Sequence, residues 1–582
     1  MNHSKSKKHQ QGSSVPMLLG LCLTLFSYFI VIGQAQPTPR SIDLAMGADM
    51  SVLGMESGEP LDTVSPGTVS GAMQVLSVDL NNDTVGDMVI GLPSANAPAG
   101  RTGAGRVYVV FGRAGQPAGA IRDLFMTPPN IIIYGAATGD QFGAALAAGD
   151  VNGDGVKDLI IGAPFADEPS GSANPVRPNV GKVYIIFGGP NVGQTAIRDM
   201  SQPANTGGAD VTIIGWGGEP NAMMIRDDAD RAGISVASGD INGDRVDDII
   251  VGAPGNDGRD GRRLDGGAVY VFFGQRNWSS GAVRDAAMPL PAGVNLLIFG
   301  RAVNFPGRGD IGGNLGRVVA VGNIAGDAAA DIITSAMIID IRNLDLGPGE
   351  VYGVVGSTAL STTQATVYDV TSGSGRYGGS QQPNFTIFGA DAQDLFDCTL
   401  AVGNLNADGY EDIIIGAPQA DGPNNGRSAA GEVYVINGAM TVASRNLAQT
   451  AADATIIGAL VGDQLGSSVA LGDVNGDRIK DLILGLPLGQ GAASQNAAGR
   501  VHVLYGGAGF IRPTRDLRVE AQAADMTIFG GGVGDQIGSS VSAGDVNGDQ
   551  IEDLLIASPF ADTCTAGQRP KAGVTFVVYG RR

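Results

Sequence analysis

Residues 149–164 read GDVNGDGVKDLIIGAP, and this stretch decides the fold because the chain repeats it. Acidic or amide side chains fall at Asp150, Asn152, Asp154 and Asp158, and the apolar run that follows is typical of a buried strand. Related stretches begin at Asp79, Asp240, Asn323, Asn404, Asp473 and Asp545. Recurrence at intervals of about 70 to 90 residues indicates a repeat architecture.

Three further segments recur around each acidic stretch. A run of small residues precedes it, as in GAALAAG (143–149), and a Val-Tyr-rich segment such as GKVYIIFG (181–188) follows the apolar run. A segment such as VTIIG (211–215) comes before the next repeat. Each unit therefore holds four short strands, and we predict an all-β, seven-bladed β-propeller of four-stranded antiparallel blades. The small-residue run is expected innermost, because blades crowd together at the axis.

The two ends of the chain predict how the ring closes. The last Val-Tyr-type segment ends at Gly580, so the seventh unit lacks its outer strand. Residues 48–54 (ADMSVLG) closely match residues 524–530 (ADMTIFG), which form the outer segment of another unit. We predict that residues 49–54 complete blade seven and hide the edges that an open array would expose.

The acidic stretch has the full form D-x-N-x-D-x-x-x-D. A tight loop with this spacing turns the side chains of positions 1, 3, 5 and 9 inward, together with the backbone carbonyl of position 7. Hard oxygen ligands in this pattern suit Ca²⁺, whereas Mg²⁺ prefers to keep its waters. Without a cation, the crowded carboxylates would repel one another. The alternative is a set of solvated Asp/Asn turns.

Six loops carry the pattern, and we predict up to six Ca²⁺ ions. The candidate ligands, in which position 7 contributes its backbone carbonyl, are Asp79, Asn81, Asp83, Val85 and Asp87; Asp150, Asn152, Asp154, Val156 and Asp158; Asp240, Asn242, Asp244, Val246 and Asp248; Asn404, Asn406, Asp408, Tyr410 and Asp412; Asp473, Asn475, Asp477, Ile479 and Asp481; and Asp545, Asn547, Asp549, Ile551 and Asp553. The Asn404 loop has one carboxylate fewer, so weaker binding is expected there. The fourth loop has Ala325 at position 3 and is expected to bind no ion.

Residues 42–582 resemble the FG-GAP repeat family and the seven-bladed propeller of integrin α chains. Phe142-Gly143 and Gly162-Ala163-Pro164 match the pattern that gives the family its name, and residues 465–487 and 537–559 contain close variants. The resemblance implies Ca²⁺ in the hairpin loops and a role in extracellular recognition. Six competent loops exceed the subset that integrin-like propellers fill. The leg domains, membrane span and tail of an integrin α chain have no counterpart here, so integrin signalling is not expected.

The N-terminus predicts export. Lys5, Lys7 and Lys8 precede an apolar run over 17–33, and Gly33-Gln34-Ala35 offers small residues for cleavage. We predict a signal peptide over residues 1–35, with a secreted, extracellular or cell-surface protein as its product. An uncleaved anchor helix is the alternative, and no other segment could span a membrane. Cys398 and Cys564 then remain, too few for a disulfide scaffold, and their pairing stays open.

Charge and topology point to the class of partner. The net charge of −21 argues against nucleic acid. A protein or glycan ligand is expected on the face opposite the calcium loops, where the insertions 216–231, 255–266 and 301–310 lie. These insertions are expected to expose Trp216, Met223, Met224, Arg262, Arg263 and Phe305, residue types that are mostly favoured at interfaces. Arg308-Gly309-Asp310 is not taken as an attachment motif, because Gly-Asp recurs at the same place in other repeats.

No enzyme motif stands out. His502 lies in a strand where other repeats have Tyr, and there is no nucleophile elbow, zinc pattern or cofactor motif. The sequence thus favours a calcium-binding propeller for extracellular recognition or adhesion that is not an enzyme. A structural surface or matrix protein without a specific ligand and a hydrolase that uses the propeller face are the alternatives.

Overall fold

We describe a computed structural model of the chain. The described residues are 40–44, 48–54, 73–168, 177–217, 229–258, 263, 265–289, 292–305, 309–337, 339–340, 345–360, 362–371, 380–396, 398–492, 494–510, 513–519, 522–562 and 571–582. Pro39–Arg582 form one compact unit. The predicted signal segment 1–35 lies outside the described residues. Among the described residues, no helix is long and apolar enough to cross a membrane.

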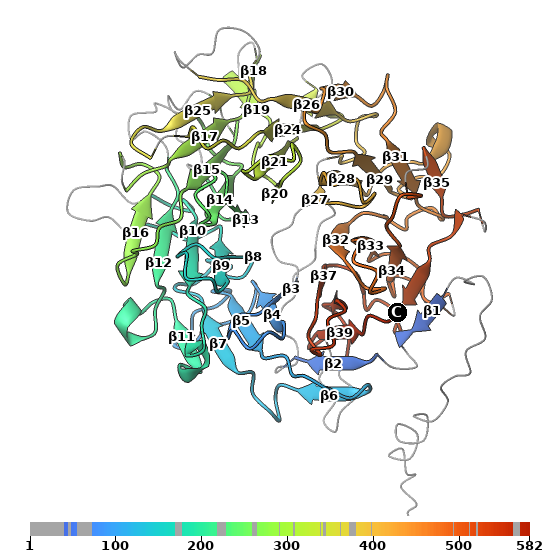
Figure 1. Ribbon diagram of the computed structural model, residues 1–582, viewed down its shortest axis with the longest axis horizontal. Coiled ribbons are helices and arrows are strands. Elements are labelled where there is room, and N and C mark those ends of the chain that lie inside the picture. Colours follow the sequence, from blue (N-terminus) through green and yellow to red (C-terminus); the bar gives the residue numbers. More distant parts are fainter. Residues whose placement is uncertain are drawn as a thin grey trace, which may run out of the picture. The chain divides into compact units, whose positions relative to one another are not determined.

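Seven five-stranded sheets make up the described part of this unit, and they form the blades of a propeller (Figure 1). The first, innermost strands are β3 (Gln74–Val78), β8 (Ala145–Gly149), β13 (Ser235–Gly239), β20 (Val319–Gly322), β27 (Thr399–Gly403), β32 (Ser468–Gly472) and β37 (Val541–Gly544). The second strands are β4 (Asp87–Leu92), β9 (Asp158–Ala163), β14 (Asp248–Ala253), β21 (Asp331–Ala336), β28 (Asp412–Ala417), β33 (Asp481–Leu486) and β38 (Asp553–Ser558).

The third and fourth strands continue each blade outward. The third are β5 (Arg106–Val110), β10 (Lys182–Ile186), β15 (Ala268–Phe272), β24 (Glu350–Val354), β29 (Glu432–Ile436), β34 (Arg500–Leu504) and β39 (Val574–Val578). The fourth are β7 (Ile131–Tyr134), β12 (Val211–Ile214), β17 (Leu296–Phe299), β26 (Phe385–Phe388), β31 (Ala454–Ile457), β36 (Met526–Phe529) and, for blade seven, β2 (Met50–Leu53). Neighbouring strands among these four are antiparallel, as in blade two.

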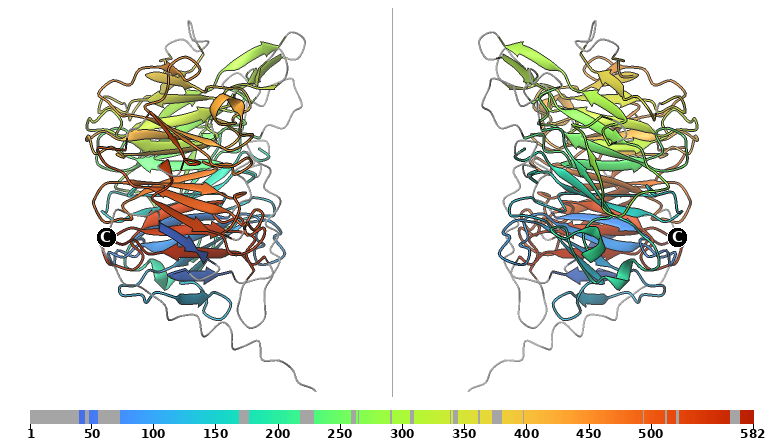
Figure 2. Two further views of the ribbon diagram at one scale, coloured as in Figure 1. Left: turned by 90° about the vertical axis from the view of Figure 1, so that its right-hand side faces the viewer. Right: turned by 90° about the vertical axis from the view of Figure 1, so that its left-hand side faces the viewer.

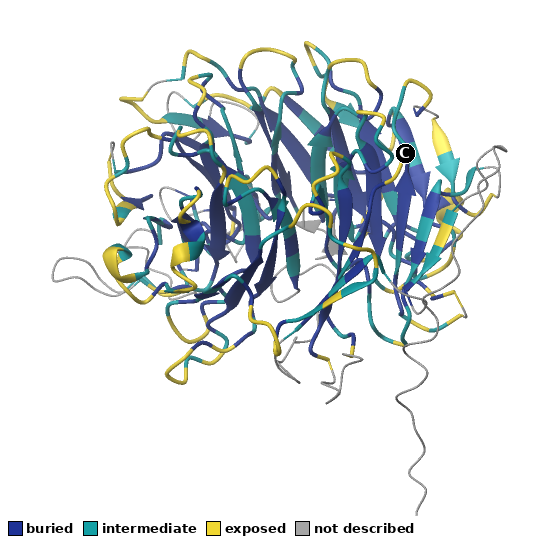
Figure 3. Ribbon diagram, turned by 60° about the horizontal axis from the view of Figure 1, so that its bottom comes forward, coloured by how far each residue is buried: buried dark blue, intermediate teal, exposed yellow. Residues whose placement is uncertain are grey.

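The ring is closed by contacts between innermost strands. β3 contacts β8, and the contacts run on through β13, β20, β27, β32 and β37 back to β3. Small residues are needed at these contacts, as predicted. A Cβ added to Gly544 would lie 2.2 Å from the hydroxyl of Ser77, in the neighbouring blade. The second strands are buried along their whole length, so the core lies between the blades (Figure 3).

The N-terminal segment contributes strands to two blades. β2 pairs antiparallel with β39, with Met50 opposite Val577, and so stands fourth in blade seven. β1 (Arg40–Asp43) pairs parallel with β36 of blade six. Asp49, just before β2, accepts the backbone N–H of Tyr579 at 2.9 Å. Two edges of the ring are therefore covered by fewer than twenty residues from the start of the described chain.

Each blade has a fifth strand, and the prediction of four-stranded blades is wrong in this respect. The fifth strands are β11 (Ile197–Asp199), β16 (Ala282–Asp285), β25 (Thr366–Asp369), β30 (Arg445–Asn446), β35 (Thr514–Asp516), β1 and β6 (Ala120–Asp123), for blades one to seven in order. They pair parallel with the fourth strands. Each comes from the connection that leads into the fourth strand of the next blade, so neighbouring blades are interlocked at the rim.

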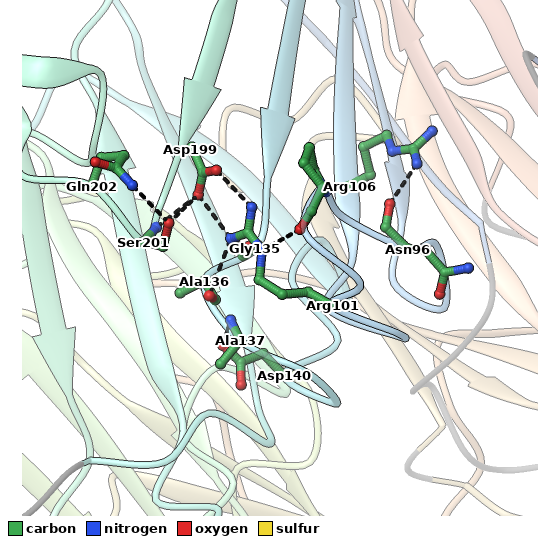
Figure 4. Close-up of polar contacts among 11 residues, drawn as sticks. Asn96, Arg101, Arg106, Gly135, Ala136, Ala137, Asp140, Asp199, Ser201 and Gln202 are labelled. Carbon is green, nitrogen blue, oxygen red and sulfur yellow. Dashed lines mark hydrogen bonds and ion pairs between the residues drawn. The ribbon is translucent and has the colours of Figure 1, made fainter.

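An arginine–aspartate clasp holds four of these fifth strands. In blade one, Arg101 donates two hydrogen bonds to Asp199, at 2.8 and 2.6 Å, and a third to the Gly135 carbonyl (Figure 4). The equivalent pairs are Arg177–Asp285, Arg263–Asp369 and Arg427–Asp516. The sequence signal for three of the fifth strands is an I/V-R-D triplet, at residues 121–123, 197–199 and 283–285, which alternation of apolar residues alone does not reveal.

Smaller elements lie on the connections. Two short hairpins are formed by β18 (Ala302–Phe305) with β19 (Gly309–Gly312), and by β22 (Ile339–Asp340) with β23 (Asp345–Leu346). Single turns of 3-10 helix occupy η2 (Val192–Gln194), η3 (Ala204–Thr206) and η4 (Pro423–Asn425). The β18–β19 hairpin, yellow-green in Figure 2, projects on the side opposite the C-terminus.

Candidate functional site: the acidic loops

The acidic stretches form the loops from the first to the second strand of each blade. Position 9 is the first residue of the second strand, and its carboxylate is fully buried in all seven blades, in Asp87, Asp158, Asp248, Asp331, Asp412, Asp481 and Asp553. Because every innermost strand runs in the same direction, all seven loops lie on one face of the ring. The structure thus brings the predicted residues of each loop together on that face.

In the loop over 150–158, backbone donors fix the side chains of positions 1, 3 and 5. Asp150 accepts the N–H groups of Asp154 and Gly155, at 3.0 and 2.9 Å. Asn152 Oδ1 accepts the N–H of Asp154 at 2.8 Å, and Asp154 in turn accepts that of Val156. The left-handed φ of 67° at Gly153 permits this turn. The side chains are therefore held inward by the loop's own backbone.

The asparagine of position 3 bridges carboxylates. Asn152 Nδ2 lies 3.1 Å from Asp154 Oδ2 and 3.3 Å from Asp158 Oδ1, so an amide donor stands between positions 5 and 9. Asn81, Asn406 and Asn475 bridge the same two positions, and Asn242 and Asn547 contact position 9. Among the described residues, no three His, Cys, Asp or Glu side chains are gathered closely enough to hold an ion by themselves. An ion would therefore need the asparagine and carbonyl oxygens as well.

The electrostatics of the loops favour a cation. The pKa of Asp158 is raised to about 7. Burial is the main cause and the charges of Asp154 and Asp150 add to it, while hydrogen bonds from the Gly188 and Val151 N–H groups act in the opposite direction. The pKa of Asp248 rises to about 8 for the same reasons. A positive charge in the loop would remove this penalty on the ionised form.

Two loops depart from the pattern. In the fourth loop, Asn323 Nδ2 donates to the Asp327 carbonyl at 2.7 Å, and Ala325 supplies no side-chain oxygen. In the fifth, Asn404 Oδ1 at position 1 is buried and has no hydrogen-bond partner among the described residues. A bound cation would give the buried Asn404 Oδ1 a partner, which this oxygen otherwise lacks.

Hydrogen bonds also link the loops of successive blades. At five interfaces between blades, the backbone carbonyl of position 1 accepts a hydrogen bond from the next loop, where the donor is the N–H of the residue just before position 9. The pairs, donor first, are Asp247 and Asp150, Ala330 and Asp240, Glu411 and Asn323, Glu552 and Asp473, and Gly86 and Asp545. The last of these joins blade one to blade seven at 2.7 Å. At three interfaces an acid that the sequence analysis missed, Asp247, Glu411 or Glu552, also accepts the N–H of position 1. Order in one loop is thus coupled to the interface with the next.

The opposite face holds the insertions that the sequence offered as a partner surface, and part of that prediction is wrong. The Arg263 side chain is 2% exposed because it forms the clasp with Asp369. Trp216 is half-buried, with its ring 6.4 Å from that of Phe299. Met223, Met224 and Arg262 lie outside the described residues, as do Arg308 and Cys564. Phe305 lies in the β18–β19 hairpin.

A cavity of about 410 Å³ opens on this face, where the innermost strands begin. Residues from all seven blades line it, among them Gln74, Ser235, Arg317 and Ser540. The single histidine of the described residues is elsewhere. His502 is buried in β34, and burial lowers its pKa to about 3. It therefore stays neutral at ordinary pH, as a structural residue would.

Comparison with known proteins gives matches to parts of the chain. The profile of the FG-GAP repeat matches residues 142–186, 232–272, 399–436, 465–504 and 537–578, which lie in blades two, three, five, six and seven. Phosphatidylinositol-glycan-specific phospholipase D of Bos taurus is 32% identical over 206 residues, which is 35% of this chain and 20% of that protein. Integrin alpha-PS2 of Drosophila melanogaster is 35% identical over 147 residues, 24% of this chain and 8% of that protein.

The chain therefore spans a fifth or less of the length of these two relatives. Among solved structures, a rhamnogalacturonan lyase aligns over 86% of this chain and 74% of its own, at 12% identity and a TM-score of 0.32. Similarity at that level carries no conclusion about activity. Each FG-GAP match, by contrast, spans one acidic loop together with the first and second strands that flank it.

Proposed function

We propose, because this chain carries FG-GAP repeats on a seven-bladed, integrin α-like β-propeller, that it is a calcium-stabilised recognition protein of the cell exterior. Ca²⁺ binds the acidic loops on one face, and the opposite face binds a protein or glycan ligand. The observation that carries the proposal is the shared geometry of six loops, in which backbone donors hold inward-turned oxygen ligands around a buried carboxylate.

The donor set fits calcium. Each of the six loops offers only oxygen ligands, from Asp and Asn side chains and the carbonyl of position 7, which is the chemistry that Ca²⁺ prefers. When bound, Ca²⁺ would supply positive charge among the carboxylates of each loop. The chain's own part is to orient the ligands through the backbone N–H groups of positions 5 to 7. Since the loops are hydrogen-bonded from blade to blade, the ions stabilise the ring and not only each hairpin.

The relatives support a role in recognition, and their names carry no activity over to this chain. The matches to the phospholipase and to the integrin cover 35% and 24% of this chain. With the loops committed to calcium, the other face is free for a partner, and it carries long connections such as the β18–β19 hairpin. The basic, apolar and small residues over 1–35 support export to an environment in which calcium is abundant. We assign no catalytic role to the propeller.

Two measurements test the proposal. Metal analysis and calorimetric titration of the purified chain with Ca²⁺ should give about six ions, and the Asp158→Asn variant should lose about one. An array of extracellular proteins and glycans, probed with and without EGTA, should yield a ligand that is lost on chelation. A chain that binds no calcium refutes the metal assignment, and calcium binding without any ligand favours a structural matrix role.

A further inference from the structure

An aspartate recurs on the face opposite the acidic loops, two residues before the aromatic or apolar residue of the FG motif. It is present as Asp140, Asp230, Asp394, Asp463 and Asp535, in the connections that enter blades two, three, five, six and seven. The first four of these residues are 2 to 9% exposed. A buried carboxylate needs a hydrogen-bond donor or a cation nearby. What supplies it differs from blade to blade.

In blades two, three and six the chain supplies the partner itself. Asp463 forms an ion pair at 3.5 Å with Arg500, the first residue of the third strand. In blade two that place is taken by Lys182, which is ion-paired with Glu168 at 2.8 Å. Burial raises the pKa of Asp140 to about 6, and the charge of Lys182 opposes the rise.

Blade three uses neutral donors instead. Asp230 accepts hydrogen bonds from the Tyr270 hydroxyl at 2.7 Å, from Asn256 Nδ2 and from the Gly217 N–H.

Blade five has the same framework as blade two. The Gln419 N–H donates to the Asp394 carbonyl at 3.2 Å, as Phe165 does to Asp140 at 3.3 Å. The rings of Phe396 and Tyr434 meet at 5.4 Å, as those of Phe142 and Tyr184 do at 5.6 Å. Glu432 stands opposite Ala417 in the register in which Lys182 stands opposite Ala163. A lysine is thus exchanged for a glutamate at an otherwise matching position.

The exchange leaves blade five with an acidic cluster, which consists of Asp391, Asp394, Asp421 and Glu432. Glu432 accepts a hydrogen bond from the Tyr434 hydroxyl at 2.6 Å, and Asp421 accepts one from a backbone N–H at 2.8 Å. The Asp394 side chain, 9% exposed, forms no hydrogen bond or ion pair within the described part of the chain. The pKa of Asp394 is raised to about 7, first by burial and then by the charges of Asp391, Glu432 and Asp421. The charge of Arg427 acts on Glu432, but both terminal nitrogens of the Arg427 guanidinium donate hydrogen bonds to the carboxylate of Asp516.

We propose that this cluster binds a basic side chain, a guanidinium or an ammonium group, of the partner protein. The proposal rests on the recognition role proposed above and names its ligand chemistry. Blades two and six show that the framework accepts Lys182 or Arg500 near the same aspartate. Blade five has Glu432 at that position, so a cation from outside the chain fits there. Asp391 is exposed and leaves the cluster open to solvent.

The test uses the full chain in saturating calcium, with acetyl-arginine amide as the probe and acetyl-citrulline amide as its uncharged control. Calorimetric titration should show saturable binding of the arginine probe and none of the citrulline probe. Asp394→Asn and Glu432→Gln should each weaken binding about tenfold, since each removes a charged acceptor. Asp140→Asn is the matched control in blade two, and it should leave binding unchanged.

Glu432→Lys supplies the missing cation internally. This variant should melt at a higher temperature than the parent chain and should no longer respond to the arginine probe. Equal binding of the probe to Glu432→Lys, or binding of both probes alike, overturns the proposal. A Ca²⁺ response that is lost in Asp394→Asn, without any response to the arginine probe, overturns it in favour of a metal site. If the arginine probe does not bind the parent chain, the proposal for the cluster is wrong. The proposed calcium role still stands in that case if the loops bind calcium.

Discussion

The Arg263–Asp369 clasp offers a sharp test of how the rim holds the blades together. The two side chains are 2% and 0% exposed and meet through two hydrogen bonds, at 3.0 and 2.6 Å. Replacing Arg263 by Met keeps the volume but leaves a buried carboxylate without its cation. Removing one partner of a buried pair costs about 3–5 kcal/mol of unfolding free energy. We expect the Arg263→Met variant to lose that much.

Urea unfolding followed by circular dichroism measures the loss, and two comparisons separate its causes. Burial by itself raises the pKa of Asp369, and the hydrogen bonds from Arg263 and Thr371 outweigh burial and lower it. Without Arg263 the pKa should rise, so the loss in Arg263→Met should shrink between pH 8 and pH 5 as Asp369 takes up a proton. The double variant Arg263→Met/Asp369→Asn should be more stable than Arg263→Met alone.

The half-buried pair Arg445–Asp453 is the matched control. Each of its side chains is 24% exposed, so Arg445→Met should cost only about 0–1 kcal/mol. A loss below about 1 kcal/mol in Arg263→Met, equal to that control, would refute the idea that the clasp secures the fifth strand.

Three further outcomes follow from the loops and the ring. Chelation with EGTA should lower the melting temperature, because each site filled at a hundredfold excess over its Kd contributes about 2.7 kcal/mol; an unchanged melting curve contradicts the calcium assignment. In EGTA the folded chain should become more stable as the pH falls from 8.5 to 5.5, because the raised pKa values of Asp158 and Asp248, about 7 and about 8, let the folded state take up protons before the unfolded state does. In saturating Ca²⁺ the same acidification should destabilise the folded chain, because protons compete with the ion. Urea unfolding at both pH values, with and without Ca²⁺, measures the two effects. Deletion of residues 40–54 removes β1 and β2, whose Met50, Val52 and Leu53 are at most 5% exposed, and should expose blades six and seven to limited proteolysis; a digestion pattern like that of the intact chain would show that these strands do not secure the ring.

Local patterns were enough to predict the blades and their loops. The alternation of Asp150, Asn152, Asp154 and Asp158 fixes a tight turn through contacts within nine residues, so it can be read without the rest of the chain. The run of small residues in 143–149 predicts an innermost strand for an equally local reason. The fifth strands escaped prediction because they are two to four residues long and pair with a strand of another blade. Arg263 was misplaced on the surface because its partner, Asp369, is more than a hundred residues away.

By itself the sequence determined the all-β repeat, the number of blades and the residues of the acidic loops. These features depend on periodicity and on side chains that lie close together along the chain. Only the tertiary structure decided which carboxylates are buried, which have a partner and which do not. Asp140 and Asp394 look alike in sequence, and they differ because the fold sets Lys182 near the first and Glu432 near the second. Burial and charge at a point in space are set by segments far apart in the chain, so the acidic cluster of blade five becomes visible only when the blades are compared in three dimensions.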